Sequence, residues 1–222
     1  MTYLYLWLIV PVILAVLHFR RESYFLSTAV TLSCAVIAVI LREPIIIAAY
    51  LCSIAGDYFM VNIRKAENNF IFGILCFFLA HVFFLWYSLH FACGVGAFVD
   101  PGPMIILIIK LTVIAAVVIF YSIFLTRGIY PSLQGNLSMR IATAMYTYIS
   151  CAVLAVSILG IVPASLPSSV LFTVGVAFIV FSDTIIALCQ FTENKRYGKI
   201  ICPTYFACHI FIAASLIALH IS

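Results

Sequence analysis

Apolar residues in this chain form long continuous runs and do not alternate with polar ones. Each run approaches the ~20 residues that a helix needs to cross the hydrocarbon core of a membrane. Continuous runs also argue against a membrane barrel, whose strands alternate apolar and polar positions. We therefore predict an all-α integral membrane protein whose eight transmembrane helices cover Tyr3–Phe19, Tyr24–Leu41, Pro44–Asn62, Phe70–His90, Met104–Leu125, Ile141–Ile161, Ser168–Cys189 and Ile200–Ile221.

Short segments with turn-forming residues separate the runs. Pro44, Pro103 and Pro167 lie at or just before predicted helix starts, where a missing N–H group costs no hydrogen bond. Asp100–Pro103 and Pro131–Asn136 have the composition of turns. No polar stretch is long enough for an extramembrane domain, so we expect a single membrane domain over residues 1–222.

Composition narrows the expected partners. Hydrophobic residues make up 66% of the chain and charged residues 8%, against about 45–50% and 25% in ordinary soluble domains. The net charge of +4 comes from short loops without a basic face, so we expect a lipid bilayer and no nucleic acid as partner. The eight cysteines form no C-x-x-C pair and lie mostly in apolar runs, which predicts packing roles. The sequence leaves the oligomeric state open.

The basic residues are distributed unevenly between the two sides of the predicted membrane. Lys and Arg concentrate on the cytoplasmic side of membrane proteins. Arg42 is on the opposite side, and Lys110 lies within the fifth span. We therefore expect both termini outside the cytoplasm, in a bacterial inner membrane. The loops after the first, third, fifth and seventh spans hold Arg20, Arg21, Arg64, Lys65, Arg127, Arg140, Lys195, Arg196 and Lys199.

Five Asp, Lys and His residues lie well inside the predicted spans, away from the span ends: Asp57, His81, Lys110, Asp183 and His209. A charge near the bilayer centre costs roughly 2.5–3.5 kcal/mol on insertion scales, which makes each a functional candidate. At about 1.5 Å per residue, both aspartates are expected roughly 8 Å below the cytoplasmic boundary. Tyr146 and Tyr205 reach a similar depth from neighbouring helices. These positions predict one polar cluster that opens toward the cytoplasm.

Each of these residues also has a structural interpretation. An aspartate near a helix end can snorkel to the surface or cap the helix, although two aspartates at matched depth favour a functional pair. A membrane histidine is more often a packing residue than a catalyst, and tyrosines commonly line the membrane interface. Lys110, close to the outer boundary, is expected to snorkel.

Similar spacings suggest an internal repeat of residues 1–100 and 101–222. Glu67-Asn68 follows Asp57 by ten residues, and Glu193-Asn194 follows Asp183 by ten. The stretch that ends at His81 also resembles the stretch that ends at His209. Four spans return the chain to the same side, so the two four-helix halves would have like orientation and would place the two aspartates opposite each other.

Short motifs lie in the third, fourth, seventh and eighth spans, and their order and spacing extend over nearly the whole chain. They are Gly56-Asp57, Gly73, Ala80-His81, Tyr87, Gly175, Ser182-Asp183 and Tyr205-Phe206-Ala207-Cys208-His209. These motifs resemble those of the lysoplasmalogenase-like (YhhN) family of eight-helix membrane proteins. His209 stands where the family often has Gln, and Arg20 and Arg21 replace a lysine common near the second span.

The resemblance implies hydrolysis of the vinyl ether bond of a single-chain ether phospholipid, lysoplasmenyl-ethanolamine or lysoplasmenyl-choline, to a fatty aldehyde and a glycerophospho-base. That reaction protonates carbon and then adds water to an oxocarbenium-like species, which suits one protonated and one ionised carboxyl group. Asp57 and Asp183 are the predicted acid/base pair, with individual roles left open. Gly56, His81, Tyr146, Ser182, Tyr205 and His209 are predicted as supporting residues.

Two alternatives remain open at this point. Asp57, Asp183, His81 and His209 have the ligand types of a zinc-dependent hydrolase, whereas the two-aspartate mechanism needs neither metal nor cofactor. The two halves also fit a proton-coupled transporter of lipids or small molecules. For the substrate phosphate, the candidates are Arg64, Lys65, Arg140, Lys195 and Arg196, each of which also serves as a topology signal.

Overall fold

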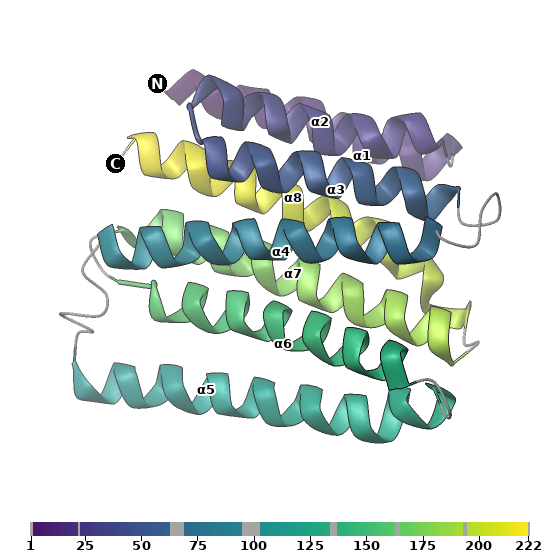
Figure 1. Cartoon of the computed structure of the whole chain (residues 1–222). Helices are drawn as coiled ribbons and strands as arrows, with labels where there is room; N and C mark the ends of the chain where they lie inside the picture. The colour runs from purple at the N-terminus through teal and green to yellow at the C-terminus, as the bar shows by residue number, and fades with distance from the viewer. Residues whose placement is uncertain are drawn as a thin grey trace.

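The protein is a bundle of eight long helices that run roughly parallel or antiparallel to one another (Figure 1). The computed structural model describes residues 2–21, 23–62, 69–94, 103–133, 137–162, 165–192 and 195–221. The long helices are α1 (Ile9–Arg21), α2 (Tyr24–Ile40), α3 (Pro44–Val61), α4 (Asn69–Gly94), α5 (Met104–Ile123), α6 (Leu137–Leu159), α7 (Leu166–Phe191) and α8 (Gly198–Ile221).

Four shorter elements extend these helices. The 3₁₀ segment η1 (Thr2–Leu8) leads into α1, and η5 (Lys195–Tyr197) leads into α8. A π-helix, η2 (Phe124–Ile129), continues α5 and passes into the 3₁₀ helix η3 (Tyr130–Leu133). The predicted boundaries shift accordingly, because polar residues beyond the apolar run can continue a helix outside the hydrocarbon core. For example, α6 begins at Leu137 and not at Ile141.

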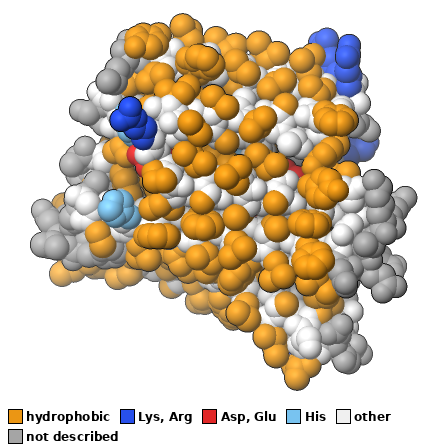
Figure 2. All heavy atoms as spheres, turned by 45° about the horizontal axis from the view of Figure 1, so that its top comes forward, with side chains coloured by type: hydrophobic (Ala, Val, Ile, Leu, Met, Phe, Trp, Pro, Cys, Tyr) orange, Lys and Arg blue, Asp and Glu red, His pale blue; other side chains and the backbone are white. Residues whose placement is uncertain are grey.

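The eight-helix architecture predicted from the hydrophobic pattern is confirmed. Seven described helical segments are long and apolar enough to cross a membrane, and α2, with 17 residues, is a shorter apolar helix. Figure 2 shows a surface covered largely by hydrophobic side chains, with Lys and Arg side chains near its edges. Such a surface suits contact with lipid and not with water, so the chain is an integral membrane protein.

Two tightly packed helix pairs form the centre of the bundle. Helix α3 packs against α4, and α7 packs against α8. A Cβ atom at Gly175 on α7 would lie 3.0 Å from the carbonyl oxygen of Cys208 and 3.1 Å from the amide nitrogen of Ile212, so only glycine permits this close approach of α8. Helices α4 and α8 then join the pairs to α6 and α2, respectively.

Helix α5 lies at the edge of the bundle and packs mainly against α6 (Figure 1). Most of its residues are exposed, but Lys110 is buried and its Nζ donates to the carbonyl oxygens of Leu159 and Ile161. These carbonyls lie at the C-terminal end of α6, where a helix has no backbone partners for its last oxygens. Lys110 therefore caps α6, whereas the sequence predicted a snorkelling role for it.

Candidate active site

Asp183 lies in the middle of α7 and is held by side chains from two other helices. The hydroxyl of Tyr146 on α6 donates to its Oδ2 over 2.9 Å, and Nε2 of His81 on α4 lies 3.2 Å from the same oxygen. The His81 side chain is 1% exposed and that of Asp183 is 11% exposed. Both contacts use Oδ2, which leaves Oδ1 available to a ligand.

The orientation of the His81 ring follows from two contacts. Its Nδ1 lies 2.9 Å from the carbonyl oxygen of Phe77, and a carbonyl oxygen only accepts, so Nδ1 is the donor of that bond. The other ring nitrogen, Nε2, faces Asp183 Oδ2 at 3.2 Å. The ring is therefore held between the α4 backbone and the carboxyl group on α7.

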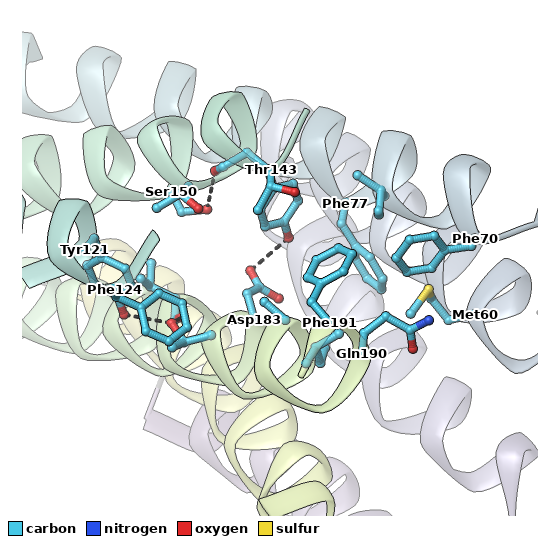
Figure 3. Close-up of a pocket in the computed structure, with 17 residues that line it drawn as sticks. Met60, Phe70, Phe77, Tyr121, Phe124, Thr143, Ser150, Asp183, Gln190 and Phe191 are labelled. Atoms are coloured by element: carbon cyan, nitrogen blue, oxygen red, sulfur yellow. Dashed lines mark hydrogen bonds between the residues drawn. The ribbon is translucent and has the colours of Figure 1, made fainter. Parts of the chain in front are cut away.

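Asp183 also lines a half-open cavity of about 80 Å³ between α4, α6 and α7, with Met60 of α3, Tyr121 of α5 and Phe124 of η2 also in its wall (Figure 3). The size exceeds the ~10–15 Å³ that a single water molecule requires. Most of the lining is apolar, with Phe70, Met60 and Phe191 together on one side of Asp183 in Figure 3 and Tyr121 and Phe124 on the other. Such a lining, with few polar groups, is typical of a site for an apolar ligand.

Several polar cavity residues were not predicted from the sequence. Thr143, Thr147 and Ser150 line the cavity from α6, and Gln190 does so from α7. Their signal was available, because Thr143, Tyr146 or Thr147, and Ser150 recur at three- to four-residue spacing within an apolar helix. On α7, Gln190 follows Asp183 by seven residues and so shares its face.

Thr184, the residue after Asp183 on α7, is hydrogen-bonded to Tyr121 on α5. Thr184 Oγ1 and the Tyr121 hydroxyl are 2.9 Å apart, and Thr184 also donates to the Val180 carbonyl oxygen over 2.7 Å. Since the threonine hydrogen is used by the carbonyl, Tyr121 is the donor between the two hydroxyls. This bond ties the C-terminal end of α5 to the cavity wall.

Asp57 on α3 has its own tyrosine partner. The Tyr205 hydroxyl on α8 donates to Asp57 Oδ2 over 2.9 Å, and the Tyr205 ring packs against the Phe77 ring with centroids 6.3 Å apart. Phe77 lines the cavity and Asp57 does not. The two aspartates thus occupy separate hydrogen-bonded sites and share no contact in the described structure.

The remaining supporting residues have mainly packing contacts. His209 is fully buried between the rings of Tyr205 and Tyr50, with centroid distances of 4.5 and 5.2 Å, and neither of its ring nitrogens has a hydrogen-bond partner. Ser182 Oγ lies 3.4 Å from the Ile201 carbonyl oxygen, a weak bond between α7 and α8. Gly56 lies against Phe77.

The structure does not bring the four candidate metal ligands together. Asp183 has His81 beside it, but Asp57 is paired with Tyr205, and His209 contacts neither carboxylate. Among the described residues, no three His, Cys, Asp or Glu side chains form a group suited to a metal ion.

The candidate phosphate-binding residues are only partly described. Arg140 is exposed, and its Cζ lies 4.7 Å from the centroid of the Tyr130 ring, a cation–π contact. Arg196 is also exposed. Arg64 and Lys65, together with the Glu-Asn motifs at 67–68 and 193–194, lie outside the described residues, as does the side chain of Lys195.

Comparison with known proteins identifies the family. The YhhN family matches residues 23–216, a range that contains α2 to α7, nearly all of α8 and every residue of the site. A search of curated proteins found no match, and neither did a search of solved structures. Because the family match covers most of the chain, the protein belongs to the YhhN family.

Proposed function

We propose that this protein is a lysoplasmalogenase-type hydrolase, which cleaves the vinyl ether bond of lysoplasmenyl-ethanolamine or lysoplasmenyl-choline with water. Membership of the YhhN family supports this class of reaction. The observation that carries the proposal is the position of Asp183, a carboxyl group at the wall of an apolar cavity whose Oδ2 lies 3.2 Å from Nε2 of the buried His81.

The proposed reaction begins with proton transfer to carbon. Asp183 donates its proton to the vinyl carbon remote from oxygen, so the C=C π electrons form the new C–H bond and an oxocarbenium ion remains. Water adds to the carbon attached to oxygen and loses a proton to the Asp183 carboxylate, which gives a hemiacetal. When the hemiacetal C–O bond to glycerol breaks, the proton of the hemiacetal hydroxyl group passes to the glycerol oxygen, and a fatty aldehyde and a glycerophospho-base leave.

The other residues hold the charges of this sequence in place. Tyr146 donates to Asp183 Oδ2, so it orients the carboxyl group. His81, fixed by its bond to the Phe77 carbonyl oxygen, places its Nε2 3.2 Å from the same carboxyl group. Asp57 is the second carboxylate of the pair, and we assign it the ionised role because Asp183, which lines the cavity, is the proposed proton donor. Its negative charge opposes that of the oxocarbenium ion.

We also propose that the two halves of the chain are structural repeats. The packing pairs α1–α2, α2–α3, α3–α4 and α4–α6 have the counterparts α5–α6, α6–α7, α7–α8 and α8–α2, each four helices later. Under this relation Asp57 on α3 corresponds to Asp183 on α7. The last helix of each half contacts the other half, which explains how α4 and α8 bring His81 and Tyr205 to the aspartate of the opposite half.

The proposed orientation has both termini outside the cytoplasm and the cavity near the inner leaflet. Figure 1 places both termini at the same end of the bundle. The opposite end receives the basic residues of α1, η2 and α6, including Arg20, Arg21, Arg127 and Arg140. A lipid that enters from the inner leaflet would meet these charges with its phosphate while its chain reaches the apolar cavity.

The decisive experiment uses purified protein with lysoplasmenyl-ethanolamine and measures fatty aldehyde. We expect aldehyde release that depends on protein concentration and disappears in Asp183→Asn. The matched substrate control is the saturated 1-O-alkyl analogue, whose ether has no double bond to protonate and should release nothing. Folded wild-type protein that releases no aldehyde would contradict the hydrolase, and transport of the unchanged lipid across proteoliposomes would favour a carrier.

A further inference from the structure

Two side chains of the cavity wall, one on α3 and one on α4, each pack against a glycine of the other helix. Phe77 of α4 lies over Gly56 of α3, and Met60 of α3 lies over Gly73 of α4. Both Phe77 and Met60 line the cavity that contains Asp183 (Figure 3). The arrangement is reciprocal, since each helix supplies one glycine and one large side chain.

The space at both glycines is too small for any other residue unless the opposing side chain moves. A Cβ at Gly56 would lie 2.9 Å from Cε1 and Cζ of Phe77, and a Cβ at Gly73 would lie 2.9 Å from Sδ of Met60. Nonbonded carbon atoms normally remain ~3.5–4.0 Å apart. An alanine at either position would therefore displace the facing side chain by a substantial fraction of an ångström.

The displaced atoms are the free ends of side chains, so the bundle can accommodate the change by turning those side chains. Tyr205 packs against Phe77 on one side, and the α3 backbone lies behind it. The cavity is the open space beside the ring. The thioether end of Met60 can likewise turn into the cavity, because Met60 also lines it. A methyl group added at Gly56 of α3 or at Gly73 of α4 would therefore narrow the cavity.

Gly175 provides a contrast within the same protein. A Cβ there would meet backbone atoms of α8 in addition to the Ile212 side chain, and a backbone cannot turn aside. Alanine at Gly175 is expected to separate α7 from α8 and destabilise the fold. Alanine at Gly56 or Gly73 is expected to keep the fold and change the cavity.

We propose that Gly56 and Gly73 determine which lipid chains the cavity admits, by keeping Phe77 and Met60 withdrawn from the path of the chain next to Asp183. The ligand class is a single-chain lipid, and the selected property is the girth of the chain near its ether end. This inference rests on the proposed function for the identity of the lipid, but the selectivity is measurable without turnover.

The test measures the Kd of saturated 1-O-alkyl lysophosphatidylethanolamines, which cannot react, for protein in nanodiscs. Two ligands are compared, one with a straight chain and one with a methyl branch next to the ether. Gly56→Ala should raise the branched-to-straight Kd ratio about tenfold or more, the lower range for one carbon in an apolar pocket. Phe77→Leu alone should lower the ratio, and the Gly56→Ala/Phe77→Leu double variant should return it to within about threefold of wild type.

The control is Gly94→Ala, also on α4, because a Cβ there meets nothing within 4 Å. Its ratio should equal that of wild type. If Gly56→Ala does not fold, Gly73→Ala against the flexible Met60, together with Phe77→Leu, decides the question. An unchanged ratio in the folded variants, or a wild type that binds neither lipid, overturns the inference. If the Kd ratios change as expected but the wild-type protein releases no aldehyde from lysoplasmenyl-ethanolamine, only the proposed hydrolysis is contradicted.

Discussion

Tyr205 on α8 donates a 2.9 Å hydrogen bond to Oδ2 of Asp57 on α3, across 148 residues of sequence. Tyr146 makes a bond of the same length to Oδ2 of Asp183. Each of these two aspartates is thus oriented by a phenol from another helix. The two bonds differ in their surroundings, because only Asp183 lines the cavity.

This difference predicts unequal effects of removing the two phenolic hydroxyls. A net loss of about 0.5–1.5 kcal/mol per hydrogen bond corresponds to roughly a two- to thirteenfold lower rate if the bond matters fully in the transition state. We expect Tyr146→Phe to lower kcat within this range. Tyr205→Phe should lower it less, because its partner Asp57 does not line the cavity. Steady-state aldehyde release by both variants, at equal folded concentration, checks the order.

The sequence was sufficient to predict the helices of this fold, because the length of each apolar run predicts a transmembrane helix independently of its neighbours. It also identified Asp57, His81, Tyr146, Asp183 and Tyr205 as unusual within apolar runs, and the structure places each of them in one of two hydrogen-bonded sites. Their catalytic roles stay predictions.

Helix pairing was beyond the reach of the sequence pattern, because lipid-facing and buried positions are both apolar in a membrane protein. For this reason the sequence predicted one cluster, whereas the aspartates lie in two separately hydrogen-bonded sites, of which only that of Asp183 lines the cavity. Burial of Lys110 was missed for a related reason, since its partners are backbone oxygens at the end of α6, which leave no signal in side-chain patterns.

The cap that Lys110 provides predicts a specific loss of stability. Lys110→Met keeps the aliphatic stem but removes the ammonium group, so the Leu159 and Ile161 carbonyl oxygens lose their partner. We expect a loss of about 1–3 kcal/mol in unfolding free energy. Activity per folded molecule should not change, because Lys110 lies eleven residues before Tyr121, or about 16 Å along α5.

Thermal unfolding in detergent measures the loss of stability in Lys110→Met. The exposed Lys199 offers a matched control, and an equal decrease in Tm for Lys199→Met would contradict the capping role.

The orientation predicts where a C-terminal reporter is found. Because basic residues gather at the end of the bundle away from both termini, a reporter fused after Ser222 should be outside the cytoplasm. Paired fusions to alkaline phosphatase and to a green fluorescent protein measure this, since phosphatase is active only outside and the fluorescent protein only inside. Strong fluorescence from the C-terminal fusion would reverse the orientation and the proposed route of the lipid.

Arg140 is the described residue best placed to test head-group binding. Its guanidinium is held over Tyr130 at the basic end of the bundle, 4.7 Å from the ring centroid. Basic residues near a membrane surface contribute about 1 kcal/mol each toward an anionic head group. Arg140→Gln should therefore raise KM about fivefold with little change in kcat. The matched control is Arg42→Gln on the opposite side of the membrane, where we expect no change. Equal KM values for both variants would assign Arg140 to topology alone.

The central prediction concerns the two aspartates. Asn nearly matches the shape of Asp but cannot donate a carboxylic proton or carry a negative charge, so it removes the chemistry and retains the packing. Loss of a positioned general acid lowers rates by ~10²–10⁴. Asp183→Asn should reach this range because it removes both the acid and the base of the proposed sequence. Asp57→Asn should also nearly abolish turnover, through loss of the negative charge that stabilises the oxocarbenium ion.

Size-exclusion chromatography and the Tm must show that both variants are folded before kcat is compared. If Asp183→Asn keeps more than about a tenth of the wild-type kcat, the acid lies elsewhere and the mechanism is wrong. If only Asp57→Asn stays active, catalysis requires one carboxyl group, and the bond between Asp57 and Tyr205 serves the packing of α3 against α8.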